Sequence, residues 1–569
     1  AVAAGGGLDS AATLSLTKLE HPDATSIGLG TNALANDDGT NNSNIAIGCN
    51  ALTTVSTGFN NLAVGINALG AATGGEGNIG IGNSALESIT TTGGNIAIGT
   101  SAGSDITSGS GAVLIGNHAG LNSSNLDKSV LIGCWAGRSA ADTVYNVTGI
   151  GFKALNVTQC HFETAIGSYS LQSSTTGFGN TAVGTYTLCA NTFGNNNTSI
   201  GYQTLCGNTT GGGNTAVGTC ALQLNTIGML NTALGSCSLN ANTTGCYNVM
   251  VGSFANNFGA TGCRNVGMGY AALYKTSGGQ NTAVGNWAMG CNTTGGENTA
   301  IGSKALYGNT IGMDNTAIGS CALYGNTTGS ANVGVGHDAL YNNTIGRYNV
   351  GIGAYANRNN TSGERNIGVG FQALMSNTTG SCNVAIGQYA GKYGTCINHV
   401  VAIGTCALYA NTTGCCNVAV GGFALQANTV GIRNTAVGHC SLALNTIGTY
   451  NTALGYGTLK QNTTGARNTA IGHAALYANT TGWLNTAVGF SSLNVNVTGQ
   501  SNTALGYGTL RKALGSCNTA IGGQTLCNLT TGQCNTAVGR HAGLTLTTGC
   551  NNTVLGYNAQ ASDSAVSNE

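Results

Sequence analysis

A nine-residue word recurs along almost the whole chain, and this repetition limits the folds that the chain can form. Residues 78–86 read NIGIGNSAL, and nearly the same word returns as NTAVGTCAL at 214–222 and NTAIGSKAL at 298–306. We take the glycine that ends each AVG, AIG or ALG run as the anchor of one repeat. Thirty-two anchors follow from Gly30 to Gly556 at steps of 17 residues, with a few steps of 16 or 18.

A period of this length is too short for a pair of helices and suits one coil of a β-solenoid. The consensus word is N-T-A-V-G-x-x-A-L-x-x-N-T-T-G-x-x, in which we expect TAV and xAL to be short extended runs. Glycine adopts positive φ at no steric cost and asparagine tolerates it, so NTTG and the anchor glycine are predicted turns. We therefore predict an all-β fold, a β-solenoid of about 32 coils over residues 25–557, between a non-repeat strand in 1–24 and a polar tail at 558–569.

Stacking of the coils brings equivalent residues to within about 4.8 Å of each other. Asn stands four residues before most anchors, as Asn78 does before Gly82, so we expect an amide ladder. Thr, Val, Ile or Leu stand three and one before the anchor, and the residue two before it is usually Ala or Gly. Side chains alternate along a strand, so each strand has one branched and one small face. The small face indicates close backbone approach, within a flat coil or between subunits, and the pattern leaves open which face points inward.

The composition excludes several other classes of protein. Gly accounts for 94 of 569 residues, but there is one Pro and no glycine at every third position, which excludes collagen. Apolar residues make up 41% of the chain, which argues against disorder even though only 6% of residues are charged. Because the formal net charge is zero, we expect no nucleic-acid partner. No run of about 18 apolar residues occurs, so we expect no membrane insertion.

Several of the 21 cysteines keep the register of the repeat, at the same distance from successive anchors. These sets are Cys189 and Cys206; Cys220 and Cys237; Cys246 and Cys263; and Cys517, Cys534 and Cys550. Equivalent residues in adjacent coils fall inside the Cα–Cα window for a disulfide, about 4.4–6.8 Å. We predict that these cysteines are disulfide candidates, which would indicate an oxidising, extracellular setting.

The turn word NTT creates N-x-T sequons at one position of the coil. They begin at Asn208, Asn242, Asn292, Asn326, Asn377, Asn411, Asn462 and Asn479. In a chain secreted by a eukaryote, this turn would carry a column of N-linked glycans. The alternative is that Asn-Thr serves only to shape the turn.

The sequence gives little indication of catalysis. NIGIGNSAL has the glycines of a nucleotide loop, but such a site needs one loop between a strand and a helix, whereas this word recurs throughout. The eight histidines have no partners at metal-ligand spacing, and we expect His439 and His473 to be solvated side chains on the outside. Most coils carry no acidic residue. We therefore expect no enzyme activity, no cofactor and no metal site.

Tyrosines form a clearer pattern. Tyr307, Tyr324 and Tyr341 each stand five residues after three consecutive anchors, which predicts a partial aromatic ladder along one edge. Such a ladder stabilises the coil by stacking, or it provides a stripe for sugars or for lateral contacts.

The segment before the repeats has a different pattern. TLSLTKLEH at 13–21 places Leu14 and Leu16 on one face, as in a half-buried strand. Our hypothesis is that this strand docks on the next subunit and gives head-to-tail growth.

NTAIGSKAL and its relatives resemble the head repeats of trimeric autotransporter adhesins, and similar words occur in phage tail-fibre-like proteins. The resemblance covers about residues 26–556. It implies that the coils stack as a left-handed β-roll.

Three functions fit these patterns. The first is a structural subunit of an extracellular filament or surface appendage, on a cell or a virion, that associates with itself as a homopolymer or homo-oligomer. The second is an adhesin or receptor-binding fibre, with glycans or a host surface as partner. The third is an ice-binding solenoid, because Thr recurs after each turn Asn.

Overall fold

The computed structural model describes residues 25–140, 144–159 and 161–569. All regular elements in this part of the chain are short β-strands, and it contains no helix. The chain divides into two compact units, one ending at Gly262 and one starting at Cys263. Sequence reasoning expected one continuous repeat region and gave no signal for this division. Leu14 and Leu16 lie outside the described residues, so the docking strand stays a prediction.

The first unit contains two kinds of strand. Its three-residue strands are β1 (Ile27–Leu29), β2 (Ile45–Ile47), β3 (Leu62–Val64), β4 (Ile79–Ile81), β5 (Ile96–Ile98), β6 (Val113–Ile115), β8 (Val130–Ile132), β11 (Thr148–Ile150), β13 (Thr164–Ile166), β14 (Thr181–Val183), β15 (Thr198–Ile200), β16 (Thr215–Val217), β17 (Thr232–Leu234) and β18 (Val249–Val251). Its two-residue strands are β7 (Leu126–Asp127), β9 (Ser139–Ala140), β10 (Val144–Tyr145) and β12 (Val157–Thr158). The short strands form separate parallel pairs, β7 with β10 and β9 with β12.

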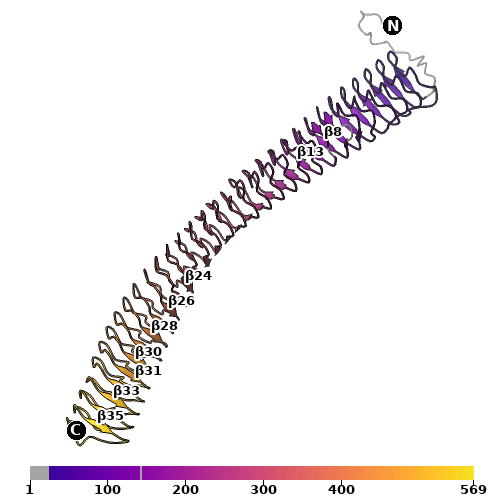
Figure 1. The fold of residues 1–569 in the computed structure, drawn as a ribbon. Coiled ribbons are helices and arrows are strands. Elements are labelled where there is room, and N and C mark those ends of the chain that lie inside the picture. Colours follow the sequence, from indigo (N-terminus) through magenta and orange to yellow (C-terminus); the bar gives the residue numbers. More distant parts are fainter. Residues whose placement is uncertain (1–24, 141–143, 160) are drawn as a thin grey trace, which may run out of the picture. The chain divides into compact units, whose positions relative to one another are not determined.

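The second unit contains only three-residue strands among its described elements. They are β19 (Val266–Met268), β20 (Thr282–Val284), β21 (Thr299–Ile301), β22 (Thr316–Ile318), β23 (Val333–Val335), β24 (Val350–Ile352), β25 (Ile367–Val369), β26 (Val384–Ile386), β27 (Val401–Ile403), β28 (Val418–Val420), β29 (Thr435–Val437), β30 (Thr452–Leu454), β31 (Thr469–Ile471), β32 (Thr486–Val488), β33 (Thr503–Leu505), β34 (Thr519–Ile521), β35 (Thr536–Val538) and β36 (Thr553–Leu555). In Figure 1 the labelled strands from β24 to β35 follow one another in chain order.

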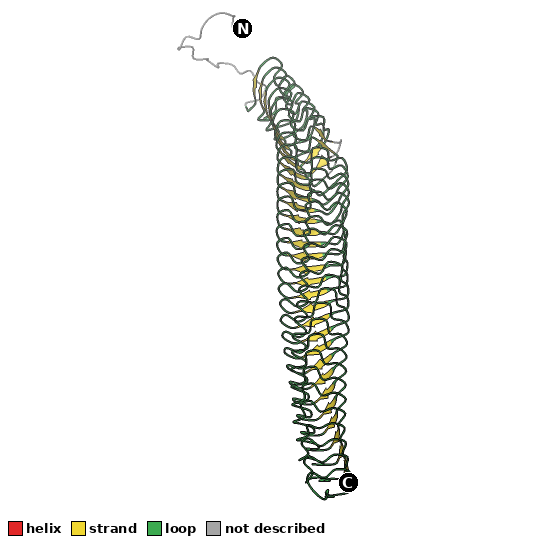
Figure 2. Ribbon diagram, turned by 90° about the vertical axis from the view of Figure 1, so that its left-hand side faces the viewer, coloured by secondary structure: helices red, strands yellow, loops and turns green. Residues whose placement is uncertain are grey.

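Successive three-residue strands of each unit pair in parallel and in register. Thr215 of β16 lies opposite Thr232 of β17, and Ala216 lies opposite Ala233. The register also holds where the repeat slips by one residue, as between β8 and β11 and between β11 and β13. Within each unit, Figure 2 shows the strands of successive coils next to one another, with loops forming most of the rest of each coil. The predicted β-solenoid with a 17-residue coil is confirmed, and its left-handed sense stays a prediction.

In most strands the inward-facing middle residue is small, and in β6, β8, β18 and β36 it is a larger apolar residue. Ala216 is fully buried, whereas Ile318, on the branched face, is 38% exposed. A Cβ added to Gly334 would lie 3.3 Å from Cγ of the buried Leu323. The small residues therefore make room for leucines inside the coil, and the branched residues cover the outside.

The anchor glycines are required by close contact between coils. Gly82 has φ of +133°, and a Cβ there would lie 2.4 Å from the carbonyl oxygen of Gly99, the next anchor. A side chain at this position would collide with the neighbouring backbone, which agrees with the prediction that the anchor is a turn glycine.

The prediction that xAL is extended is wrong. Ser84 and Leu86 both adopt left-handed backbone angles, with φ of 55° and 52°, and they lie in a turn. A left-handed residue costs about 1–2 kcal/mol. Leu86 is completely buried, and burying a leucine gives back about 2 kcal/mol. The turn is tolerated because it directs Leu86 into the coil.

Residues 558–569, predicted to be an aperiodic tail, form a further coil on β36. Thr547 N donates to Ser564 O at 2.7 Å, and Thr553 N donates to Glu569 O at 2.8 Å. The Asn552 amide donates to Val566 O at 2.7 Å. Backbone groups can continue the register without the consensus side chains, which is why the sequence pattern did not reveal this coil.

Candidate functional site

The predicted amide ladder is present inside the coils. Asn78 Nδ2 donates to Asn61 Oδ1 at 3.1 Å and to Thr92 O at 3.0 Å. Asn78 Oδ1 accepts from both N and Nδ2 of Asn95, at 3.1 and 3.2 Å. All three asparagines are buried. Each side chain therefore joins three coils, and Asn78 is fully used by the fold rather than by a ligand.

A second Asn column runs through the sequons, and its burial contradicts the glycosylation hypothesis. The eight sequon asparagines are all at most 1% exposed: Asn208, Asn242, Asn292, Asn326, Asn377, Asn411, Asn462 and Asn479. Asn208 Nδ2 donates to Asn191 Oδ1 at 2.8 Å and to Gly211 O at 2.9 Å. A glycan on this nitrogen would require the coil to open. The burial therefore favours the alternative that Asn-Thr serves only to shape the turn.

The first cysteine pair has its sulfur atoms close together. Cys189 Sγ and Cys206 Sγ lie 2.8 Å apart in the thiol form. Their hydrogen bond lowers the pKa of Cys206 to about 7. Thiolates are the form that reacts to make disulfides. The pair is therefore suited to oxidation, and the disulfide itself stays a prediction.

The other cysteine sets also stay disulfide predictions. Burial raises the pKa of Cys220, and the charges of Cys237 and Cys206 raise it further. Desolvation raises the pKa of Cys534, and Cys517 and Cys550 add to the effect. Cys246 belongs to the first unit and Cys263 to the second, so that pair also stays a prediction.

The predicted tyrosine ladder is confirmed. Tyr307 and Tyr324 stack with ring centroids 5.2 Å apart, and Tyr324 and Tyr341 stack at 5.0 Å. Arg358 extends this column, since its guanidinium lies 5.2 Å from the Tyr341 ring centroid.

A second aromatic column, which sequence reasoning missed, lies one residue after each anchor. We call it the ring column, and it consists of His439, Tyr456, His473, Phe490 and Tyr507. Successive centroids lie 5.7, 5.1, 5.1 and 5.5 Å apart, and neighbouring planes differ by 7° to 23°. The two histidines are exposed, as the sequence predicted, and they also belong to a stack that it did not predict. The sequence does contain a signal for this column, because an aromatic or His residue directly follows each of five consecutive anchors.

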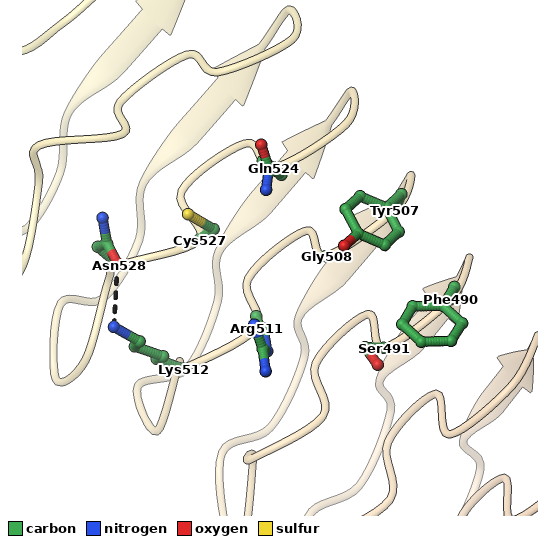
Figure 3. Close-up of a pocket in the computed structure, with 9 residues that line it drawn as sticks. All are labelled: Phe490, Ser491, Tyr507, Gly508, Arg511, Lys512, Gln524, Cys527 and Asn528. Carbon is green, nitrogen blue, oxygen red and sulfur yellow. Dashed lines mark hydrogen bonds between the residues drawn. The ribbon is translucent and has the colours of Figure 1, made fainter.

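A cavity of about 160 Å³ lies at the C-terminal end of the ring column. Phe490 and Tyr507 form one wall, and Arg511, Lys512 and Gln524 line the rest (Figure 3). Lys512 Nζ donates to Asn528 Oδ1 at 3.1 Å. The cavity combines aromatic surface, amide groups and two exposed cations, which makes it the best-formed candidate site.

The charge distribution also points to this part of the chain. The net charge of zero hides an uneven distribution, because no Asp or Glu occurs between Glu364 and Asp563. The same stretch holds eight cations: Arg365, Lys392, Arg433, Lys460, Arg467, Arg511, Lys512 and Arg540. Charge counted along the chain, rather than as a total, would have revealed this stretch of excess positive charge.

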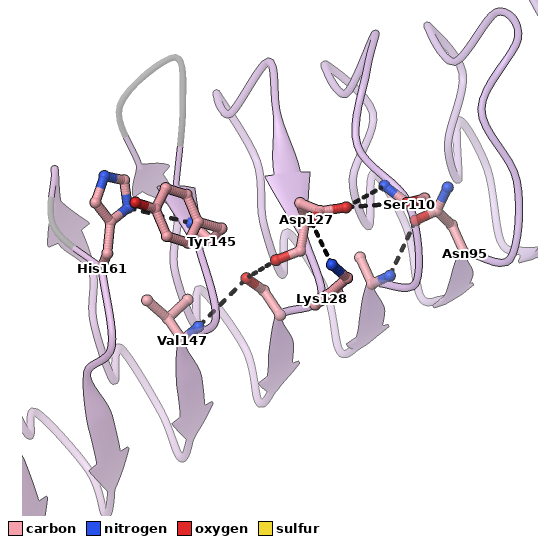
Figure 4. Close-up of polar contacts among 9 residues, drawn as sticks. Asn95, Ser110, Asp127, Lys128, Tyr145, Val147 and His161 are labelled. Carbon is pink, nitrogen blue, oxygen red and sulfur yellow. Dashed lines mark hydrogen bonds and ion pairs between the residues drawn. The ribbon is translucent and has the colours of Figure 1, made fainter.

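A polar cluster in the first unit has a different character. Asp127 accepts hydrogen bonds from Ser110 N at 3.2 Å and from its hydroxyl at 2.9 Å, and it lies 3.6 Å from Lys128 Nζ (Figure 4). The Ser110 hydroxyl is the main cause of a lowered pKa at Asp127. Tyr145 stacks on His161 at 3.7 Å. These groups mainly bond one another across coils, so we interpret the cluster as a structural contact between coils.

Glu163 replaces Asn in the first ladder. Its carboxylate accepts from Asn180 Nδ2 at 2.9 Å and from the Ser174 hydroxyl at 3.1 Å. Burial raises the pKa of Glu163 to about 7, against an ordinary value of 4.5. It is a titratable group built into the interior of the fold.

In the described residues, no group of three or more His, Cys, Asp or Glu side chains is arranged to hold a metal ion. No helix in the same part of the chain has the length and hydropathy needed to cross a membrane. No protein-family model matches the chain, and no curated protein matches it either.

Proposed function

We propose that this protein is a structural subunit of an extracellular filament or surface appendage that assembles with copies of itself. The main support for the proposal is that the outer face of the strands is uncharged. The residues that point outward are Thr, Val, Ile, Leu or Met, and none of the three-residue strands carries a charge. Extended uncharged faces of this kind favour association with another protein surface.

Exposed members of this face recur from coil to coil. In the second unit, Ile301, Ile318, Ile352 and Ile386 are each 38–40% exposed. They lie on β21, β22, β24 and β26, in equivalent positions. The same surface on a second copy would match this spacing, because both have the repeat of the parallel sheet.

The interior supports a mechanical role. Asn side chains bond from coil to coil in two columns, as Asn214 does to Asn197 at 3.1 Å and Asn225 does to Asn208 at 2.8 Å. In a repeat protein, each such contact couples nearest neighbours. Separating two coils therefore requires breaking ladder bonds together with the strand pairing, which suits a load-bearing element.

The test is whether the outer face drives assembly. Wild-type protein is expected to form filaments or defined oligomers in sedimentation velocity and negative-stain electron microscopy. The double variant Ile318→Lys with Ile352→Lys is expected to stay monomeric. Ile311→Lys is the matched control, because Ile311 is 54% exposed but lies in a turn. A wild-type protein that stays monomeric at all concentrations, or a double variant that assembles normally, contradicts the proposal.

Deletion of residues 1–24 separates two forms of assembly. If the N-terminal strand gives head-to-tail growth, the deletion abolishes filaments and leaves the solenoid folded. If only the outer face associates, the deleted protein still assembles side by side.

The second candidate is an adhesin or receptor-binding fibre. The exposed ring column and the cationic cavity at its end favour this alternative, because aromatic and cationic surfaces often recognise ligands. Immobilised protein that binds cells or glycan-coated surfaces without forming assemblies in solution would favour the adhesin over the filament subunit.

A further inference from the structure

The ring column stops abruptly after Tyr507. The next coil has Gly523 at the equivalent position, and the coil after that has Arg540. A Cβ built on Gly523 would meet only one atom within 4 Å, Cγ of Arg540 at 3.9 Å. The face of Tyr507 that points away from Phe490 therefore has no ring stacked on it. We call this gap the Tyr507 slot.

The slot has the thickness of one ring. Tyr507 and Arg540 are two coils apart, which corresponds to about 10 Å along the stack. The plane of Tyr507 lies within 23° of the plane of Phe490, so its free face looks along the column. Because Gly523 contributes no side chain, one six-membered ring fits in the place that an aromatic residue occupies in the preceding coils.

The cavity that Tyr507 lines brings polar and charged groups next to the slot. Gln524 and Asn528 come from the coil that lacks the ring, and Arg511 and Lys512 come from the coil that carries Tyr507 (Figure 3). Gln524 Oε1 is held by His541 Nε2 at 2.7 Å, and Lys512 is held by Asn528. These partners fix the amides beside the slot. No carboxylate stands between Glu364 and Asp563 to compete for the cations.

We propose that the Tyr507 slot binds one acidic sugar unit of a glycan, a pyranose that carries a carboxylate or a sulfate. The apolar face of the pyranose stacks on the free face of Tyr507. Its acidic group pairs with Arg511, Lys512 or Arg540, and its hydroxyls bond to Gln524 and Asn528. This site goes beyond the structural role proposed above and does not depend on it.

The geometry favours a sugar over a single-stranded nucleic acid. A polynucleotide is bound by a succession of open aromatic faces on which consecutive bases stack. In the ring column, Tyr456, His473 and Phe490 are covered by a ring on both sides. At the other end of the column, the edge of Phe423 packs against His439, with ring centroids 5.6 Å apart. Tyr507 is therefore the end of the column that keeps a face without a ring contact, which matches a ligand that presents one ring at a time.

Calorimetric titration of the full chain tests the proposal with four probes. They are a heparin-derived tetrasaccharide, tetragalacturonic acid, the neutral maltotetraose and a 15-residue oligothymidylate. We expect at least one of the two acidic saccharides to bind, and maltotetraose and the oligonucleotide to bind at least about tenfold more weakly, a difference of about 1.4 kcal/mol.

Two variants locate the binding at the slot. Tyr507→Ala removes the stacking face and is expected to weaken acidic-saccharide binding at least about tenfold. Gly523→Tyr extends the ring column and fills the slot, so binding should be lost while the fold is retained or stabilised. This second variant keeps the test valid if Tyr507→Ala weakens the coil.

Tyr456→Ala is the matched control. Tyr456 and Tyr507 are 55% and 56% exposed, but Tyr456 lies inside the column and offers no open face. Its replacement should leave binding within about twofold of wild type. The proposal is overturned if neither acidic saccharide binds, if Gly523→Tyr binds as the wild type does, or if Tyr456→Ala loses as much affinity as Tyr507→Ala. It is also overturned if the oligonucleotide binds most tightly and the slot variants abolish that binding.

Discussion

Two regions of the first unit fold into similar coils with different interiors. In residues 44–112, the position seven after the anchor is apolar, and in residues 180–248 it is asparagine. The apolar set is Val55, Ala72, Ile89 and Ile106, and the asparagine set is Asn191, Asn208, Asn225 and Asn242. All eight side chains are buried. One backbone path therefore accepts either a hydrophobic column or a hydrogen-bonded one.

The two regions also differ in how tightly the turn is bonded. In the asparagine region, the Thr226 hydroxyl donates to Thr243 O at 3.0 Å. In the apolar region, the equivalent bond from Thr90 to Thr107 O is 3.5 Å long. The anchor glycine and the buried Leu are common to both, for example Gly82 with Leu86 and Gly218 with Leu222 in the same register. The shared Gly and Leu positions therefore set the backbone path of the coil, and the column residues adjust the length of the hydrogen bond in its turn.

The largest effect is expected at the shared anchor, equally in both regions. Gly82→Ala and Gly218→Ala would place a Cβ 2.4 Å and 2.7 Å from the backbone of the next anchor. Each should destabilise its coil by about 4 kcal/mol through backbone strain and overlap. Native-state hydrogen exchange of the adjacent strand amides measures this locally. Gly523→Ala, which has room for a Cβ, is the control, and unequal losses at the two anchors would contradict a common path.

A pH-dependent effect is expected at Glu163, which lies between the two regions and takes the place of a ladder Asn. Its pKa is about 7 in the folded protein and 4.5 ordinarily. Stability from this group is therefore fully present below pH 4.5 and is lost as the pH rises through about 7. The loss should approach about 3 kcal/mol of local unfolding free energy.

Glu163→Gln should remove this dependence, because an amide oxygen can still accept from Asn180. Hydrogen exchange of the coil at pH 5 and pH 8 compares the two proteins. If the variant and the wild type lose protection equally between these pH values, Glu163 is not the group responsible.

Exchanging the columns tests the comparison directly. Asn225→Val should cost about 2 kcal/mol, because Asn208 and Asn242 each lose a buried partner. Ile89→Asn should cost a similar amount, because its column neighbours Ala72 and Ile106 cannot bond an amide.

Replacing all four column asparagines by valine should cost less per site than the single change, since no orphaned amide remains. Denaturant titration of each variant measures these values, and a strictly additive loss would contradict the column model.

The smallest effect is expected at the threonine that follows the column residue. Thr226→Val removes a hydrogen bond of 3.0 Å and should cost about 1 kcal/mol. Thr90→Val removes one of 3.5 Å and should cost less than half as much, because a bond of this length contributes little. The same denaturant titration compares the pair, and a larger loss at Thr90 would reverse the ranking of the two regions.

Much of the fold could be predicted because it depends on the repeat alone. The 17-residue step placed Asn78 above Asn61 and Tyr324 above Tyr307, and both ladders are present. The candidate site could not be predicted in the same way. The open face of Tyr507 arises from a missing side chain at Gly523, and the sequence pattern treats that glycine as one more variable position.

The period, the parallel register and the columns of like residues follow from the amino-acid sequence alone, because equal spacing forces equivalent residues into contact once coils stack. Three other features became clear only from the folded coil: which strand face lies inside, the burial of Asn208 beyond the reach of a glycan, and the left-handed turn at Leu86. These features depend on how one coil closes on itself. The closure is set by the balance between local strain and the burial of side chains, which no single repeat reveals.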